Sequence, residues 1–369
     1  MHNLLSPSAL VVATLFLSTV GWHSATGNQP MQARTCDSPQ VTAITDKDAT
    51  GPIYVACSIR FPNKTKIQRT IIFEGANASG ATLDCNGGAI DTSAGKKTSE
   101  KIAIIVRSKR TSEDRWEAPR YVTVKNCEIR GLMRVYGLDE NANGPNMRAS
   151  SINANHTAFA QKSAPSHISF LNLSIEAIGG AALYIGPGAT WTTIADSDLR
   201  GYVGGTAIYM DAESSDNSIT NNTFSVRTKS RELIAIDGSA HNRITSNTFN
   251  DPLNGGIFLY RNCGEGGVIR HQRPQLNLIA RNTFTYTREV HRAKPAVWLG
   301  SRQGNRKHCF SDPRHSFGSS LSPLDFARKN EVKDNSIFGG FPQLIRNSDT
   351  GNVVHNNNVY PNLRSMLAK

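Results

Sequence analysis

Short apolar runs alternate with short polar turns along the chain, and one combination of the two recurs. Six segments share the order polar, any, aliphatic, any, any, Asn-like, any, apolar: TTIADSDL, NSITNNTF, NRITSNTF, NLIARNTF, NEVKDNSI and NVVHNNNV. Their aliphatic residues, at positions 194, 219, 244, 279, 332 and 354, follow one another at intervals of 25, 25, 35, 53 and 22 residues. The chain therefore contains a repeat of about 22 to 25 residues, and two copies carry insertions.

Each copy also contains a second apolar run. These runs are AALYIG, TAIYMD, ELIAID, GIFLYR and PAVWLG, and fainter copies of the first pattern precede them as VTVKNCEI and ISFLNLSI. Two or three strands of four to six residues per copy, separated by Gly, Asn, Asp and Ser and without helical periodicity, predict the coils of a β-solenoid. An Asn recurs at positions 222, 247, 282, 335 and 357, which predicts a structural ladder of stacked amides inside one turn.

These repeats resemble those of right-handed parallel β-helix proteins of the pectate-lyase-like superfamily, over about residues 75 to 360, and LDCNGGAI resembles the entry into such a helix. The resemblance implies an all-β, single-stranded right-handed parallel β-helix of about ten coils. Residues 28–75 would form an N-terminal cap and residues 76–369 the helix. The superfamily includes polysaccharide lyases, glycoside hydrolases, epimerases, tailspikes, adhesins and periplasmic accessory proteins, so the resemblance does not fix the reaction.

The N-terminus predicts export. An apolar stretch of about twelve residues from Ala9 to Val20 precedes small residues, which is typical of a signal peptide over residues 1–27. An uncleaved anchor is the alternative, because no Lys or Arg precedes the stretch. We expect a periplasmic or secreted protein that has no membrane span after cleavage and is a monomer.

Six cysteines suit an exported chain in which disulfides form. Cys263 and Cys309 lie in the two insertions and are predicted to pair, with two buried free thiols as the alternative. Cys36 and Cys57 are the next pair expected. Cys85 and Cys127 fall one coil apart, where they either bond or stack.

Composition narrows the class of partner. The 369 residues carry a net charge of +12, with 38% hydrophobic and 7% aromatic residues. No nucleic-acid recognition motif accompanies the basic charge, so an acidic glycan explains it better than nucleic acid.

Stacking of the coils converts the second apolar runs into a column of residues that end each run. The column contains Gly186, Asp211, Asp237, Arg261 and Gly300. Two carboxylates about 5 Å apart could act as acid and base in glycoside cleavage, or hold a cation such as Ca²⁺. The alternative is that both aspartates only cap turns. No cofactor motif is visible.

Both insertions leave the solenoid after the same strand, which predicts that they lie side by side along a groove. Their ionisable residues are Arg261, Glu265, Arg270, His271, Arg273, Arg302, Arg306, Lys307, His308, Arg314 and His315. Arginines pair with the carboxylates of an acidic polysaccharide. In β-elimination, Arg261 or a cation would neutralise the uronate, and His271, Tyr260 or Arg270 would remove the C5 proton. The alternative to a catalytic role is that each of these residues is simply a solvated or salt-bridged charge in a loop.

The sequence thus predicts an exported enzyme that cleaves an acidic polysaccharide, with a uronate lyase ahead of a glycoside hydrolase. A C5-epimerase on the same fold, or a non-catalytic periplasmic glycan-binding or accessory protein, is also compatible with these features. The predicted catalytic residues are Asp211, Asp237, Arg261, Glu265, Arg270 and His271, and the predicted substrate-binding residues are Tyr260, Trp298 and Arg302.

Overall fold

The computed structural model describes residues 33–287, 290–304, 314–315, 317–318 and 322–361. All of them belong to one compact unit, Met31–Lys369. The predicted signal peptide, residues 1–27, lies outside the described residues, as does Cys309. No helix among the described residues is long and apolar enough to cross a membrane.

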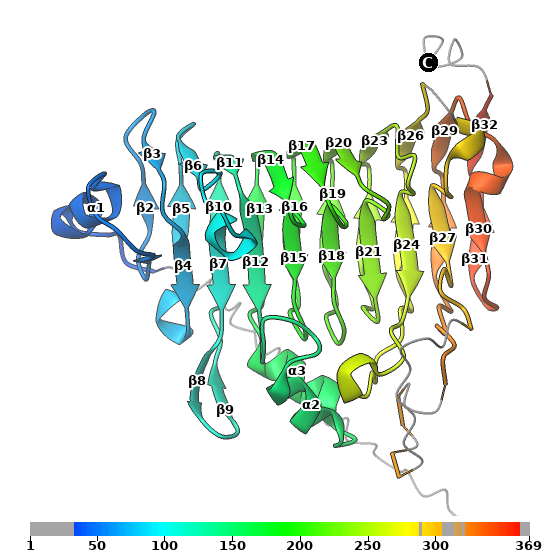
Figure 1. Ribbon diagram of the computed structural model, residues 1–369, viewed down its shortest axis with the longest axis horizontal. Helices are drawn as coiled ribbons and strands as arrows, with labels where there is room; N and C mark the ends of the chain where they lie inside the picture. The colour runs from blue at the N-terminus through cyan, green and yellow to red at the C-terminus, as the bar shows by residue number, and fades with distance from the viewer. Residues whose placement is uncertain (1–32, 288–289, 305–313, 316, 319–321, 362–369) are drawn as a thin grey trace, which may run out of the picture. The chain divides into compact units, whose positions relative to one another are not determined.

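Three parallel sheets of ten strands each build this unit (Figure 1). Sheet 1 contains β1 (Ile53–Tyr54), β4 (Ile71–Glu74), β7 (Ile102–Arg107), β12 (Leu132–Tyr136), β15 (Leu183–Ile185), β18 (Ile208–Met210), β21 (Ile234–Asp237), β24 (Ile257–Tyr260), β27 (Val297–Leu299) and β30 (Ile345–Asn347). Sheet 2 contains β2 (Ile59–Arg60), β5 (Thr82–Asp84), β10 (Thr123–Lys125), β13 (Ser169–Leu171), β16 (Thr193–Ala195), β19 (Ser218–Thr220), β22 (Arg243–Thr245), β25 (Leu278–Ala280), β28 (Glu331–Lys333) and β31 (Val353–His355). Sheet 3 contains β3 (Lys66–Ile67), β6 (Ala89–Asp91), β11 (Glu128–Arg130), β14 (Ser174–Gly179), β17 (Asp198–Val203), β20 (Thr223–Thr228), β23 (Thr248–Asn250), β26 (Thr283–Thr285), β29 (Ser336–Phe338) and β32 (Asn358–Tyr360).

Each coil contributes one strand to each sheet, so the predicted parallel β-helix of about ten coils is confirmed. The first coil begins at Ile53, inside the segment 28–75 that the sequence assigned to the cap. Before it stands helix α1 (Ser38–Thr45), which Asp37 caps at its N-terminus. A disulfide between Cys36 and Cys57, a pair expected from the sequence, ties the segment before α1 to the first coil.

The interior is a continuous apolar core that runs the length of the coils. Inward residues stack on their equivalents one coil away, as in Phe224, Phe249 and Phe284, whose ring centroids lie 4.7 Å apart. Such ladders form because parallel strands in register place equivalent residues of successive coils directly above one another.

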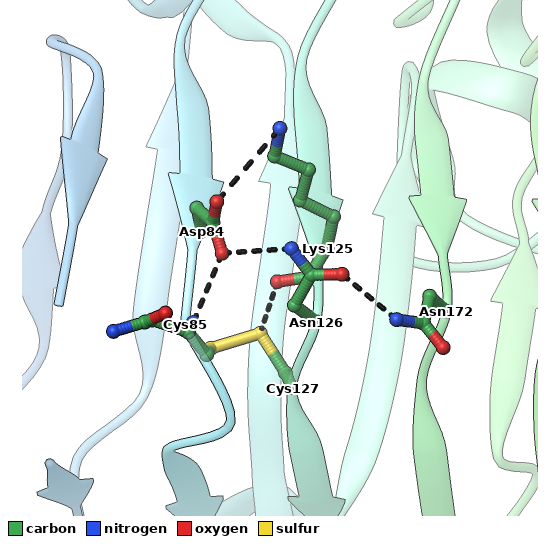
Figure 2. The surroundings of a disulfide bond; sticks show 7 residues. Asp84, Cys85, Lys125, Asn126, Cys127 and Asn172 are labelled. Atoms are coloured by element: carbon green, nitrogen blue, oxygen red, sulfur yellow. Dashed lines mark hydrogen bonds and ion pairs between the residues drawn. A yellow bond between two sulfur atoms is a disulfide. The ribbon is translucent and has the colours of Figure 1, made fainter. Parts of the chain in front are cut away.

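A second disulfide joins Cys85 to Cys127 across the turns that follow β5 and β10 (Figure 2). The neighbouring Asn126 donates its side-chain amide to Asp84 at 2.9 Å and accepts the amide of Asn172 at 2.8 Å. Of the two outcomes left open for this pair of cysteines, bonding is the one observed.

The irregular segments leave from the ends of sheet 1 strands and gather along one edge of the solenoid (Figure 1). The hairpin of β8 (Lys109–Ser112) and β9 (Arg115–Glu117) follows β7, and helices α2 (Pro145–Ser151) and α3 (His156–Ser163) follow β12. The two insertions seen in the sequence follow β24 and β27. We call residues 138–165, 261–276 and the described part of 300–329 the loop wall.

Contacts within the loop wall confirm that the two insertions lie side by side. The Arg261 backbone N–H donates to Asp325 at 3.0 Å, and the Arg302 side chain donates to Asn262. The α2–α3 segment also packs against these insertions. The ring of His271 contacts the Ser151 carbonyl at 2.7 Å. The sequence did not reveal this segment.

Candidate functional site

The outer face of sheet 1 carries two columns of side chains, because residues alternate inward and outward along each strand. The first column is Arg134, Tyr184, Tyr209, Ala235, Phe258, Trp298 and Arg346. Two residues further along the strands, the second column includes Asp211, Asp237 and Tyr260. Between Arg134 and Arg346 this column is mainly aromatic, and beyond Arg134 it continues through Ile105 and Ile72.

Arg261 does not lie in the second column, and the predicted register is wrong there by one residue. The strand pairing sets Ile236 beside Leu259 and Asp237 beside Tyr260. This register keeps Leu259 in the apolar core, whereas the predicted one would place Tyr260 inside. Tyr260 therefore takes the position predicted for Arg261.

Arg261 instead enters the loop wall, where its side chain is only 2% exposed. Its guanidinium donates to the Leu324 carbonyl at 3.0 Å and lies 5.0 Å from the ring of Phe326. Burial, together with the charge of Arg273, lowers the pKa of Arg261 to about 10. Arg261 is thus a buried residue of the loop wall and lies outside the second column.

Two tyrosines of the first column each donate to an aspartate of the second column on the next coil. The Tyr209 hydroxyl donates to Asp237 at 2.6 Å, and the Tyr184 hydroxyl donates to Asp211. The two tyrosine rings are stacked, with centroids 5.9 Å apart. Adjacent coils therefore present two equivalent Tyr–Asp pairs.

Burial raises the pKa of Asp211 and of both tyrosines. It raises the pKa of the Asp211 carboxyl, a rise that Asp237 reinforces and Arg270 opposes. Burial and the neighbouring carboxylate also raise the pKa of Tyr184 and of Tyr209 well above the ordinary tyrosine value. Both phenols are therefore proton donors at neutral pH.

Hydrogen bonds from the loop wall fix both carboxylates. Asp237, which is fully buried, accepts the Asn262 backbone N–H at 2.8 Å and the Asn262 side-chain amide. Asp211 accepts the backbone N–H groups of Ala142 and Ala212, and Arg270 lies 3.4 Å from it. Arg270 also donates to Asn143 at 2.7 Å, which anchors this arginine to the segment before α2.

Cationic side chains surround Tyr260 at the other end of the aspartate column. The Arg302 guanidinium lies 3.9 Å above the tyrosine ring. Arg231 donates to the Tyr260 hydroxyl at 2.6 Å and pairs with Glu232 at 2.7 Å. Burial, with the charge of Glu232, raises the pKa of Tyr260 well above its ordinary value.

Among the nine residues predicted for the site, six come together on or beside this face: Asp211, Asp237, Tyr260, Arg270, Trp298 and Arg302. Trp298 is half-buried there, and the Arg346 guanidinium lies 4.5 Å from its ring. The other three are Arg261, Glu265 and His271, which lie in the loop wall, as Arg270 and Arg302 also do. Glu265 lies in the short 3-10 turn Glu265–Gly267, and the ring of His271 packs against His156 with centroids 5.0 Å apart.

Sequence reasoning missed Tyr184, Tyr209, Arg231, Glu232 and Asn262. A signal for the tyrosines was present, because in ALYIG and AIYMD each stands two residues before the column position and so faces outward. Asn262 could not be found in this way, because it lies in an insertion without a repeat.

Among the described residues, no three His, Cys, Asp or Glu side chains converge as a metal ion would require. Hydrogen-bond donors already occupy the oxygen atoms of Asp211 and Asp237. The Ca²⁺ that paired carboxylates suggested therefore finds no ready set of oxygens at this pair.

The three sheets and their register define the class: the chain is a right-handed parallel β-helix protein. The sequence profile of the family described as "Right handed beta helix region" matches residues 96–273. No curated protein matches the sequence.

Several solved structures are similar in fold. An alginate lyase from Paenibacillus sp. str. FPU-7 has a TM-score of 0.46 at 11% identity, over 87% of this chain and 93% of that one. A surface protein and adhesin of Streptococcus pneumoniae has a TM-score of 0.42 at 12% identity, over 87% and 92%. The A-module of a mannuronan C-5 epimerase from Azotobacter vinelandii has a TM-score of 0.35 at 10% identity, over 81% and 80%. Likenesses of this size say nothing about the reaction.

Proposed function

We propose that the outer face of sheet 1 binds an acidic polysaccharide and that the chain cleaves it as a uronate lyase, by β-elimination. The observation that carries the proposal is the row of Tyr184, Tyr209, Phe258 and Trp298 along this face, bordered by arginines and backed by two buried aspartates.

Binding follows from the chemistry of the row. Aromatic rings pack against the C–H faces of sugars, while guanidinium groups pair with carboxylates. Successive coils repeat about every 4.8 Å, so a chain of sugars that runs along the solenoid would meet the same kind of contact on each coil. Arg302 and Arg346 would hold the uronate carboxylates.

β-Elimination needs a group that neutralises the carboxylate, a base for the C5 proton and an acid for the leaving oxygen. In this proposal Arg302 neutralises the carboxylate. Tyr209 takes the C5 proton as its own proton passes to Asp237. The electron pair of the broken C5–H bond forms the C4–C5 double bond, the C4–O4 bond breaks, and Tyr184 protonates the departing oxygen. No step runs through a metal ion.

The test is a screen of acidic polysaccharides that scores both the ultraviolet absorbance of unsaturated ends and new reducing ends. Tyr209→Phe keeps the ring and removes the hydroxyl, so we expect kcat to fall by about a hundredfold or more while KM changes little. Tyr202→Phe is the matched control, because Tyr202 is exposed on β17 of sheet 3.

Other products would contradict this proposal and indicate a different reaction. Reducing ends without absorbance would indicate a hydrolase, and inversion at C5 without cleavage would indicate an epimerase. Retention of full activity in Tyr209→Phe would show that Tyr209 does not remove the C5 proton.

Glycan binding without turnover is the second candidate, and one observation favours it. Asp211 and Asp237 are buried and hydrogen-bonded, as in networks whose only role is to order a core. Binding of the polymer with neither product would establish this candidate.

The two disulfides described above support an oxidising compartment, so we propose that the protein acts in the periplasm or outside the cell. We also propose that it is a monomer, as expected from the sequence.

A further inference from the structure

A pocket away from the sheet 1 face lies between the β8–β9 hairpin and helices α2 and α3. Its volume is about 450 Å³, within the usual range for small-ligand sites. A separate apolar cluster of Leu138, Met147, Ala160 and Val268 lies beneath it, against which Trp116 and Phe159 pack. The pocket thus has its own small core.

The lining of the pocket combines aromatic surface with neutral polar groups. Trp116 and Phe159 are half-buried and line it. Asn146, Ser150 and Asn155 supply amide and hydroxyl groups around these rings. A sugar ring presents the same two kinds of surface, an apolar C–H face and a rim of hydroxyls.

The charges at the pocket disfavour an acidic ligand. Arg110 donates to the carbonyls of Ser112 and Glu113 at 3.1 and 2.9 Å, and to Asn146 at 3.1 Å. Three of its five guanidinium N–H groups thus already have acceptors within the protein. Glu113 and Asp114 line the same pocket and would repel a carboxylate.

We propose that this pocket binds an uncharged sugar residue, with Trp116 as the stacking surface. It shares no residue with the Tyr–Asp pairs, so it does not depend on the proposed reaction. The chain would then carry two glycan sites of different charge preference.

The test uses the full chain and a panel of uncharged oligosaccharides of glucose, galactose, mannose and N-acetylglucosamine, with uronate oligosaccharides beside them. Binding is measured by calorimetry. We expect at least one uncharged oligosaccharide to bind, and its affinity to fall about tenfold or more in Trp116→Ala. The exposed Trp191, in the turn before β16 of sheet 2, provides the control Trp191→Ala, which should bind as the wild type does.

A second variant distinguishes the loss of a ligand contact from the loss of structure. Asn155 is exposed and its side chain makes no capping bond to α3, so Asn155→Ala should fold normally and still weaken binding several-fold. The proposal is overturned if no uncharged oligosaccharide binds, if Trp116→Ala binds as well as the wild type, or if Trp116→Ala selectively loses uronate binding.

Discussion

His156 is a fully buried histidine at the start of α3, and its environment favours the neutral ring. Burial lowers its pKa from 6.5 to about 4; Glu213 opposes this shift, and the neighbouring His271 and Arg270 reinforce it. Its Nδ1 lies 2.9 Å from the Ser150 hydroxyl. Between about pH 4 and pH 6.5 the unfolded chain therefore binds a proton that the folded chain does not.

This difference predicts a pH dependence of stability. Since the unfolded state binds more protons between about pH 4 and pH 6.5, the contribution of His156 to stability is present above this window and is lost as the pH falls through it. We expect the free energy of unfolding of the wild type, relative to His156→Gln, to fall by up to about 3 kcal/mol from pH 7 to pH 4. Urea unfolding of both proteins at a series of pH values measures this difference in the free energy of unfolding.

The comparison with the variant is necessary because Asp325 acts in the opposite direction. Burial raises the pKa of Asp325 from 3.8 to about 6, so its contribution falls as the pH rises through that window. The two slopes partly cancel in the wild type. A difference between wild type and His156→Gln that did not change with pH would contradict the assignment.

At the scale of the element, two asparagine ladders hold the turns of successive coils together. In one, the Asn247 side chain accepts from the Asn222 amide at 3.0 Å and donates to Asn282 at 3.0 Å. The recurring Asn predicts this ladder. A second ladder, not predicted, is formed by Asn217, Asn242, Asn277, Asn330 and Asn352.

Removal of one rung should be costly. In Asn247→Ala, the backbone and side-chain N–H groups of Asn222 and the Ile219 carbonyl lose a buried partner, so we expect a loss of about 3 kcal/mol in the free energy of unfolding. Asn250→Ala is the control, since this exposed side chain donates to the Ser225 hydroxyl and its loss should cost less than about 0.5 kcal/mol. A loss below about 1 kcal/mol for Asn247→Ala would show that the ladder contributes little.

The repeat explains which elements the sequence could predict. Copies such as NSITNNTF and NRITSNTF are stacked one coil apart, so their similarity directly indicates sheets and core. The α2–α3 segment belongs to no copy. Its contacts with the site, such as that between Asn143 and Arg270, span 127 residues of sequence and follow from packing alone.

Register limited the prediction of the site more than residue type did. Asp211 and Asp237 were found because their strands align without insertion, whereas Arg261 was misplaced because GIFLYR fits the repeat equally well one residue away. A shift of one residue reverses the face to which a side chain points.

At the scale of the whole molecule, the net charge of +12 should attract an acidic polymer over distances longer than any single contact. Salt shortens this range, because the Debye length falls from about 14 Å at 0.05 M to about 4 Å at 0.5 M salt. The two proposed glycan sites should therefore respond differently to salt. Polymer affinity at sheet 1 rests on charge, whereas that of the pocket lined by Trp116 does not.

We accordingly expect the affinity for an acidic polysaccharide to fall by about tenfold or more over this range of salt, and that for an uncharged oligosaccharide to change less than about twofold. Calorimetry at matched salt concentrations measures both on the same preparation, so unfolding by salt would appear as a loss of both. If the acidic polymer bound equally well at both concentrations, its recognition would have to rest on stacking against Tyr184, Tyr209 and Trp298 and not on the arginines that border them.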